Sequence, residues 1–226
     1  MNKRLRIGLA PVLIISAVAA LPATTQAAPH VYENAVKKAE GQKLRYLGWG
    51  TLKLKNATLG AFECHHIFAG YLENPAGGSA AEGKTQAFVP YECVSTACTV
   101  FNAKGIAISA ETMPWDAEVI EPEAGVFRQK TGFKATEKNK PPKEPGFVEL
   151  TLNCEGVFET KFFGETNPKI LDDGLSIGSF PGEEEFTPGA AGESELESEG
   201  LGNWEWEGKV KFAGYANLAL IEVKNP

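Results

Sequence analysis

The sequence predicts a mostly β protein, an antiparallel β-sandwich or barrel-like domain with two structural disulfides after a cleaved signal peptide. Three observations predict this class. Short stretches alternate apolar and polar residues, 24 glycines and 14 prolines interrupt the chain, and four cysteines follow an N-terminal export signal. Alternation with a period of two is typical of strands with one buried face. Disulfides persist in the oxidising compartments that exported proteins reach.

The N-terminus has the three parts of a secretory signal peptide. Three basic residues within the first six positions precede an apolar run from Ile7 to Leu21, and small residues follow up to Ala27. The run spans about 15 residues, whereas a membrane-spanning helix needs roughly 20. We therefore expect residues 1–27 to be removed as a signal peptide. Residues 28–226 are then expected to form a single β-rich extracytoplasmic domain that is secreted and does not span a membrane.

The charge of the mature chain limits the classes of partner. The signal contains three of the 22 basic residues and none of the 29 acidic residues, which leaves a mature net charge of −10. Phosphate binding depends on clustered Lys and Arg. The composition therefore argues against nucleic acid and anionic membranes, and leaves cations, neutral ligands and basic partners open.

Ten segments have the alternation expected of strands, and glycine, proline or polar residues separate most of them. In chain order they are 43–47, 49–55, 61–69, 85–91, 105–110, 147–154, 157–163, 193–199, 204–212 and 215–223. Before them, residues 32–39 fit a helix or a hairpin equally well, because Asn34 and Gly41 favour turns. About ten or more short strands favour a sandwich or a barrel.

Three polar segments are expected to connect these strands. Residues 74–79 form a loop tip, and residues 134–146 contain two adjacent prolines that cannot occupy a central strand. That second connection is the candidate sub-boundary within the domain. Residues 181–192 combine glutamates with Pro and Gly and are expected to be a loose, mobile connection. We find no repeat of fixed period, which argues against solenoids and propellers.

The four cysteines are expected to form two disulfides, and three pairings are open. We favour Cys93 with Cys98, which are five positions apart, and Cys64 with Cys154, which would join two predicted strands. A Cys-x4-Cys spacing differs from the redox Cys-x-x-Cys motif. The cysteines are therefore interpreted as structural.

No metal site or cofactor is expected. His65 and His66 are adjacent, so in a strand they point to opposite faces, whereas zinc needs three or four converging donors. The glutamates at 193, 195, 197 and 199 lie nearly 7 Å apart along one strand face, too far apart for a compact Ca²⁺ cage. A solvated edge strand that resists aggregation is the favoured interpretation. Asp172-Asp173-Gly174 is expected to be a turn.

Trp204 and Trp206 are the candidate ligand-binding residues. In a strand the two indoles share one face, and Glu205 and Glu207 share the other. A flat indole pair could stack against a sugar ring, whereas the simpler alternative places the aromatic side in the core. Carbohydrate or an envelope component is the partner that this pair suggests. Exposure of the indoles to a quencher would separate the two interpretations.

The common catalytic motifs are missing. The sequence contains no Gly-x-Ser-x-Gly, His-Glu-x-x-His, phosphate-binding glycine loop or Ser-x-x-Lys. We therefore assign no catalytic residue and favour a secreted, non-enzymatic binding or envelope-associated protein. The alternatives are a secreted hydrolase without a recognisable motif and a purely structural envelope protein.

The mature chain also resembles a family of secreted β-rich proteins from soil actinobacteria that has no assigned activity. The matching segments are Cys64, 73–78, 91–98, 113–115, Arg128 with Thr131-Gly132, 152–154 and 211–215. The resemblance implies an extracellular or envelope setting and structural disulfides. It implies no activity and no site residues.

Overall fold

The computed structural model describes residues 27–57, 59–100, 103, 105–132, 148–171, 182–186, 195–198, 201–215 and 218–225. The expected signal peptide lies outside these residues except for Ala27, and the connection 134–146 and the turn at 172–174 lie outside them as well. The described chain is mostly antiparallel β, as predicted, with a short helix α1 (Thr96–Val100). In this part of the chain no helix has the length and apolar character needed to cross a membrane.

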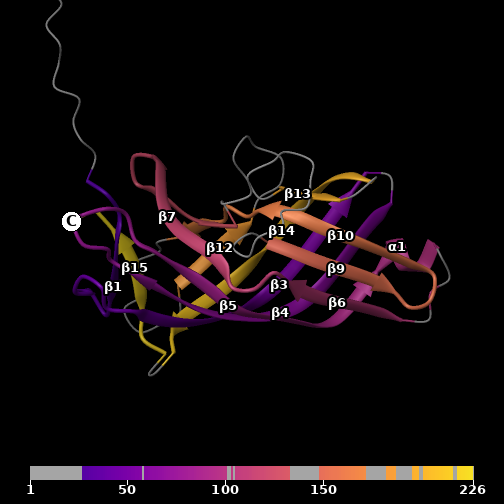
Figure 1. Ribbon diagram of the computed structural model, residues 1–226, viewed down its shortest axis with the longest axis horizontal. Helices are drawn as coiled ribbons and strands as arrows, with labels where there is room; N and C mark the ends of the chain where they lie inside the picture. The colour runs from indigo at the N-terminus through magenta and orange to yellow at the C-terminus, as the bar shows by residue number, and fades with distance from the viewer. Residues whose placement is uncertain are drawn as a thin grey trace, which may run out of the picture.

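The strands follow one another with few other elements between them. They are β1 (His30–Glu33), β2 (Val36–Lys37), β3 (Leu44–Asn56), β4 (Gly60–Glu73), β5 (Glu82–Ser95), β6 (Ile106–Glu111), β7 (Trp115–Glu123), β8 (Val126–Thr131), β9 (Val148–Cys154), β10 (Phe158–Glu165), β11 (Lys169–Leu171), β12 (Gly182–Phe186), β13 (Glu195–Ser198), β14 (Gly202–Gly214) and β15 (Ile221–Lys224). Four of them, β3, β4, β5 and β14, have 13 or 14 residues and cross most of the molecule (Figure 1).

One set of strands closes into a ring. Hydrogen-bonded neighbours run β3–β4–β5–β7–β8–β11–β12–β14, and β14 pairs again with β3. The ring is thin at β8–β11, where one residue pair and the neighbouring bridge between Thr131 and Thr166 hold the strands together. This curled sheet agrees with the barrel-like alternative of the sequence prediction.

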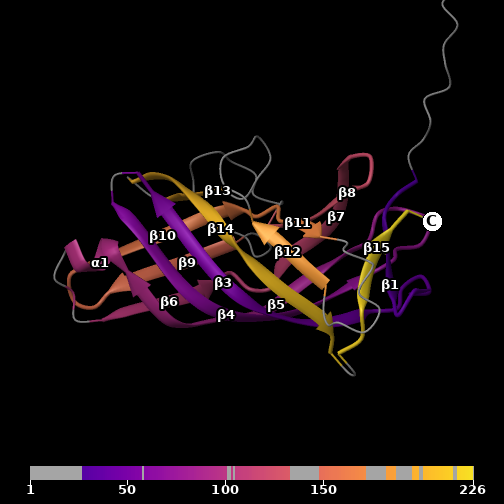
Figure 2. The same ribbon diagram turned by 180° about the vertical axis from the view of Figure 1, so that it is seen from behind.

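A second set of strands curls from the same long strands but stays open. It runs β14–β13–β10–β9–β6, and β6 has no ladder with β5 in the described residues. Beyond Thr85, β5 pairs with β4 alone, because β7 covers only Glu82–Thr85. We call the unpaired boundary between Gln86–Ser95 of β5 and β6 the seam. Figures 1 and 2 place α1, β6, β9 and β10 at one end of the molecule, opposite β1 and β15.

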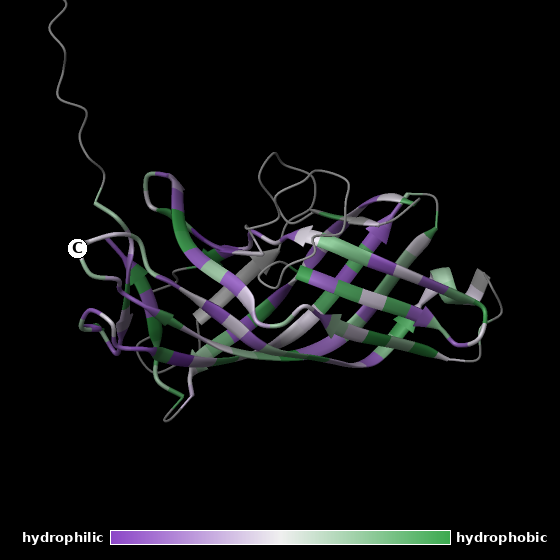
Figure 3. Cartoon of the chain, viewed as in Figure 1, coloured by the Kyte–Doolittle hydropathy of each residue, from purple (hydrophilic) through white to green (hydrophobic). Residues whose placement is uncertain are grey.

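The core lies inside these two curls. Alternating residues of the strands are buried, and the cartoon coloured by hydropathy has matching bands along the strands (Figure 3). Gly48 on β3 belongs to the buried face, and a Cβ there would lie 2.1 Å from the Phe68 ring. Glycine at this position therefore makes room for an aromatic side chain of the neighbouring strand.

A separate three-stranded sheet, β15–β1–β2, closes one end. The segment 32–39 is therefore a hairpin and its helical alternative is wrong. Asn74, at the end of β4, fastens this sheet to the main one. Its side chain is fully buried, accepts a hydrogen bond from the Val31 N–H at 2.8 Å, and donates to the carbonyls of Val31 and Lys38.

Several expectations need correction. The hairpin β7–β8 and the short elements α1, β11 and β12 were not predicted. Of the described residues in the last expected strand, 215–223, residues 221–223 lie in β15 and residues 215 and 218–220 lie in no strand. Residues 182–186 form β12 between β11 and β14, so this part of the segment expected to be loose is ordered by two neighbours. Strand β13 pairs with β10 and β14, so it is not an edge strand. Leu196 and Ser198 are buried on it.

Candidate functional site

The predicted tryptophan pair lies in the core. Trp204 and Trp206 do share a face of β14, but they are only 0% and 2% exposed. Trp204 donates its indole N–H to Ser198 Oγ at 2.9 Å and meets the Phe162 ring edge-on at a centroid distance of 4.9 Å. Neither indole offers an open face to a sugar. The observation that suggested carbohydrate binding through this pair is therefore removed.

Trp206 instead lines a small cavity inside the closed ring. The wall consists of His66, Phe68, Thr85, Phe88, Trp115, Gln129, Thr131, Thr166, Pro168 and Trp206. The cavity volume is about 30 Å³, which suits a few water molecules, whereas small-molecule sites measure about 300–1,000 Å³. The cavity that these described residues enclose is therefore too small for a sugar.

His66 is the titratable group of this interior. It is 1% exposed and stacks on Phe88 and Phe68, with ring centroids 4.9 and 5.8 Å away. Burial and, to a smaller extent, the charge of the neighbouring His65 lower the pKa of His66 to about 4. No carboxylate lines the described wall, so the imidazole is neutral at neutral pH. The prediction that His65 and His66 point to opposite faces is confirmed, because the His65 side chain is 50% exposed.

Exposed apolar side chains gather on the outer face of β4 and β5. Ile67, Val89, Tyr91 and Val94 are 42–65% exposed. Cross-strand pairing places them in rows. Trp49 of β3 is opposite Ile67, and Ile67 is opposite Val89. We call the surface formed by Trp49, His65, Ile67, Val89, Tyr91 and Val94 the β3–β5 face.

The second row of this face is aromatic. His65 is opposite Tyr91, and their rings stack at a centroid distance of 5.7 Å. The next row carries charge, since Lys53 and Glu63 form an ion pair at 3.7 Å beside Val94. The β3–β5 face is therefore an apolar and aromatic surface with a polar border at this end.

Beyond Val94 the surface deepens into a groove of about 570 Å³ beside α1. Apolar atoms dominate its lining, which includes Phe62, Val94, Ala103 and Ile106. The groove lies where β5 ends and β6 begins, at one end of the seam. Its volume is within the range of ligand pockets, and it continues the β3–β5 face.

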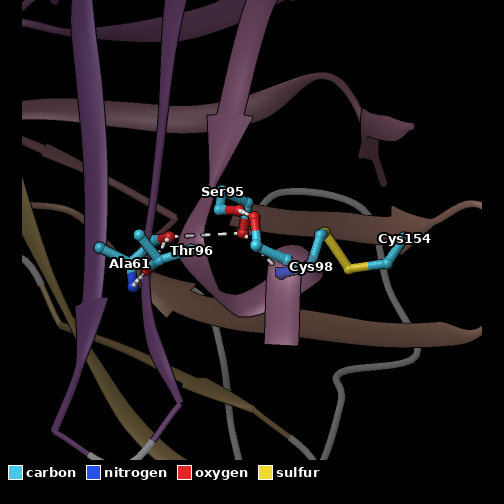
Figure 4. The surroundings of a disulfide bond; sticks show 6 residues. Ala61, Ser95, Thr96, Cys98 and Cys154 are labelled. Carbon is cyan, nitrogen blue, oxygen red and sulfur yellow. Dashed lines mark hydrogen bonds between the residues drawn. A yellow bond between two sulfur atoms is a disulfide. The ribbon is translucent and has the colours of Figure 1, made fainter. Parts of the chain in front are cut away.

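Helix α1 is fixed against β4 and β9, as Figure 4 shows. The hydroxyls of Ser95 and Thr96 donate to the carbonyl of Ala61, and Thr96 Oγ1 accepts from the Ala61 N–H at 2.9 Å. Gly60 precedes this contact at φ +96°, where a Cβ would lie 2.5 Å from Thr96 Oγ1. The disulfide Cys98–Cys154 then links α1 to the end of β9. These bonds give the groove a rigid wall.

The structure contains two disulfides, as predicted, but the favoured pairing of the cysteines is wrong. Cys64 pairs with Cys93 and Cys98 pairs with Cys154, with Cα atoms 4.1 and 5.2 Å apart. Cys64 and Cys93 lie on neighbouring strands, at a register shift where Glu92 has a φ of 50°. Because β5 ends before Cys98, α1 carries that cysteine towards β9. Closeness in sequence therefore did not decide the pairing.

A polar depression of about 420 Å³ lies on the outer face of β6, β9 and β10. The polar side chains that line this depression form hydrogen bonds with one another. Lys161 Nζ donates to Glu149 at 2.7 Å, and Asn153 donates to Glu159 at 2.8 Å. The hydrogen bond that Lys161 donates to Glu149, together with the negative charge of that carboxylate, raises the pKa of Lys161. These groups neutralise one another, and the arrangement assigns no catalytic acid or base.

In the described residues no three His, Cys, Asp or Glu side chains gather closely enough to hold a metal ion. Comparison with known proteins adds no assignment, because no family model, curated protein or solved structure shows significant similarity to the chain.

Sequence reasoning missed the β3–β5 face. A signal existed in β5, where Phe88 faces the core while Val89 and Tyr91 face outward. Apolar residues on both faces are typical of a strand that is packed against other elements on both faces. In the described residues only the inner face of β5 is packed, against the core.

Proposed function

We propose that this chain is a non-enzymatic binding module that works outside the cytoplasm and docks a protein partner on the β3–β5 face. One observation carries the proposal: four neighbouring apolar side chains of β4 and β5 are 42–65% exposed beside a half-buried Trp49. Contiguous exposed apolar surface on a soluble domain typically marks an interaction site.

A protein suits this face better than a sugar. Ile67, Val89 and Val94 are aliphatic, and aliphatic burial drives protein association without the specific stacking that a sugar ring requires. The aromatic groups Trp49 and Tyr91 are of the kinds enriched in the energetic centres of protein interfaces. The charged pair Lys53–Glu63 would form part of the polar rim.

The extracytoplasmic setting rests on two supports. The N-terminal sequence has the pattern of a signal peptide, and all four cysteines are paired in disulfides. A hydrolase has no comparable support, since the polar groups of the depression on β6, β9 and β10 pair internally.

Site-specific photo-crosslinking in a secreting bacterial host tests the proposal. A photoreactive residue replaces Val89, and in a matched control it replaces Val36, which is 68% exposed on β2. We expect a discrete crosslinked protein partner at position 89 but not at 36, and loss of that product when Ile67→Asp is added. Equal labelling at both positions, or none at 89 above the control, would refute docking on this face. Crosslinks to glycan alone would replace the protein partner with a polysaccharide.

A further inference from the structure

We propose that the partner binds by strand addition: an extended polypeptide segment enters the seam, pairs with the free edge of β5 and places an apolar side chain in the groove beside α1. This inference rests on the proposed function and specifies the binding mode of the same site.

Strand β5 has a free edge along the seam. From Gln86 to Ser95, β5 is hydrogen-bonded to β4 along one side only, and no backbone hydrogen bond joins it to β6 in the described residues. Strand β6 is likewise paired only with β9. Two strand edges therefore face each other without a ladder between them.

A strand edge presents N–H and C=O groups at a regular spacing, and an extended polypeptide is the ligand that matches this pattern. Natural proteins usually protect long edges by charge, proline or a covering element. In β5 the exposed side chains are largely apolar, with Val89, Tyr91 and Val94 all above 40% exposure. Within the edge, Pro90 removes a single donor, and the exposed carboxylate of Glu92 adds a charge at a register shift. The edge is therefore suited to a strand that pairs on both sides of Pro90.

The groove supplies the side-chain contact that strand addition needs for specificity. It lies at the end of the seam, between Val94 of β5 and Ile106 of β6, and it reaches Phe62. Lys53 and Glu63 stand at its border. An incoming strand that runs along β5 would reach this groove with an apolar residue near its end.

The space between β5 and β6 must widen for a full strand. Cα atoms of the two strands approach within 8 Å, whereas a strand between them needs about 9.6 Å, twice the spacing of paired strands. Strand β6 can give way, because among named strands it is held by β9 alone. Strand β5 is held along its whole length by β4 and stays in place. The incoming segment therefore pairs with β5 and displaces β6 outward.

The test uses a phage-displayed library of random dodecapeptides, selected on the oxidised mature domain in the presence of excess Val94→Asp variant as competitor. The selected peptide is synthesised unmodified and in two N-methylated forms, one methylated at odd and one at even backbone amides. In an added strand, alternate N–H groups point to the partner. One methylated form should therefore bind at least about tenfold more weakly, through the loss of several hydrogen bonds, while the other binds nearly as well as the parent peptide.

Hydrogen exchange gives the second measurement. Amides of residues 86–95 should become protected when the peptide binds, and the peptide should bind normally to a Val157→Asp control, which alters an exposed valine in the turn before β10. Equal affinity of both methylated forms, unchanged exchange in β5, or failure to select any peptide would each overturn strand addition. None of these results would affect the crosslink at position 89, so docking on the face would stand or fall separately.

Discussion

The buried neutral His66 makes the fold sensitive to mild acid. In the folded state its pKa is about 4, against an ordinary value of 6.5. The unfolded chain therefore binds a proton at His66 between these two values, and the folded chain does not. Stability from this group is fully present above pH 6.5 and is lost as the pH falls towards 4. Below pH 4 both states are protonated and the loss stops growing.

The magnitude follows from the difference in pKa. A separation of about 2.5 units corresponds to about 3 kcal/mol, at 1.36 kcal/mol per unit. This is a large part of the stability of a typical domain, which is about 5–15 kcal/mol. The physical cause is the aromatic enclosure, since Phe68 and Phe88 stack on the imidazole and the described cavity wall contains no carboxylate to stabilise its charge.

The assay is urea unfolding of the oxidised protein and of a His66→Leu variant at pH 7.5 and pH 4.5. Many carboxylates also titrate in this range, so the comparison between the two proteins isolates the histidine. We expect the free energy of unfolding to fall by about 2–3 kcal/mol more in the parent than in the variant. Parallel losses in the two proteins would show that His66 is hydrated or paired in solution, and the burial argument would be wrong.

Removing the disulfide with Cys98→Ser and Cys154→Ser should lower stability by about 4 kcal/mol in the chain-entropy model, since it closes a loop of 56 residues. Non-reducing peptide mapping should recover Cys98 linked to Cys154. Trp49→Phe should remove most of the acrylamide-quenchable tryptophan emission, because Trp49 is half-buried while the other three indoles are buried. Asn74→Ala should cost about 2–4 kcal/mol in chemical unfolding, through three lost hydrogen bonds that include both backbone groups of Val31.

The long strands were the most predictable part of the fold. In β3 and β4 the buried residues recur at every second position, and the expected segments 61–69 and 204–212 lie wholly within β4 and β14. The hairpin β7–β8 was harder to predict, because Glu118, Glu121 and Pro122 interrupt its apolar pattern. Its stability comes from neighbours far away in sequence, since β7 pairs with β5.

Local patterns predicted only part of the candidate site. Trp204 and Trp206 were singled out because they are conspicuous in sequence, yet the same alternation that puts them on one face puts that face inside the curled sheet. The alternation in β5 indicates that Val89 and Tyr91 face away from the core, but their exposure depends on whether another part of the chain covers that outer face. That is a property of topology, and the sequence of β5 does not contain it. The cysteine pairing failed for the same reason, because it depends on where α1 carries Cys98.

The seam has a cause in the path of the chain. Strand β7 follows β6 in the chain, and the chain bends between them at Thr112, which has a φ of 57°. After the bend β7 pairs with β5, whereas before it β6 pairs with β9. One long strand is therefore central in the closed ring and an edge in the open curl. The closed ring, both disulfides and β4 hold β5 in position, so its free edge is presented by a rigid framework. Such an edge loses little conformational entropy when a partner binds, and this preorganisation favours the use of the open curl for recognition.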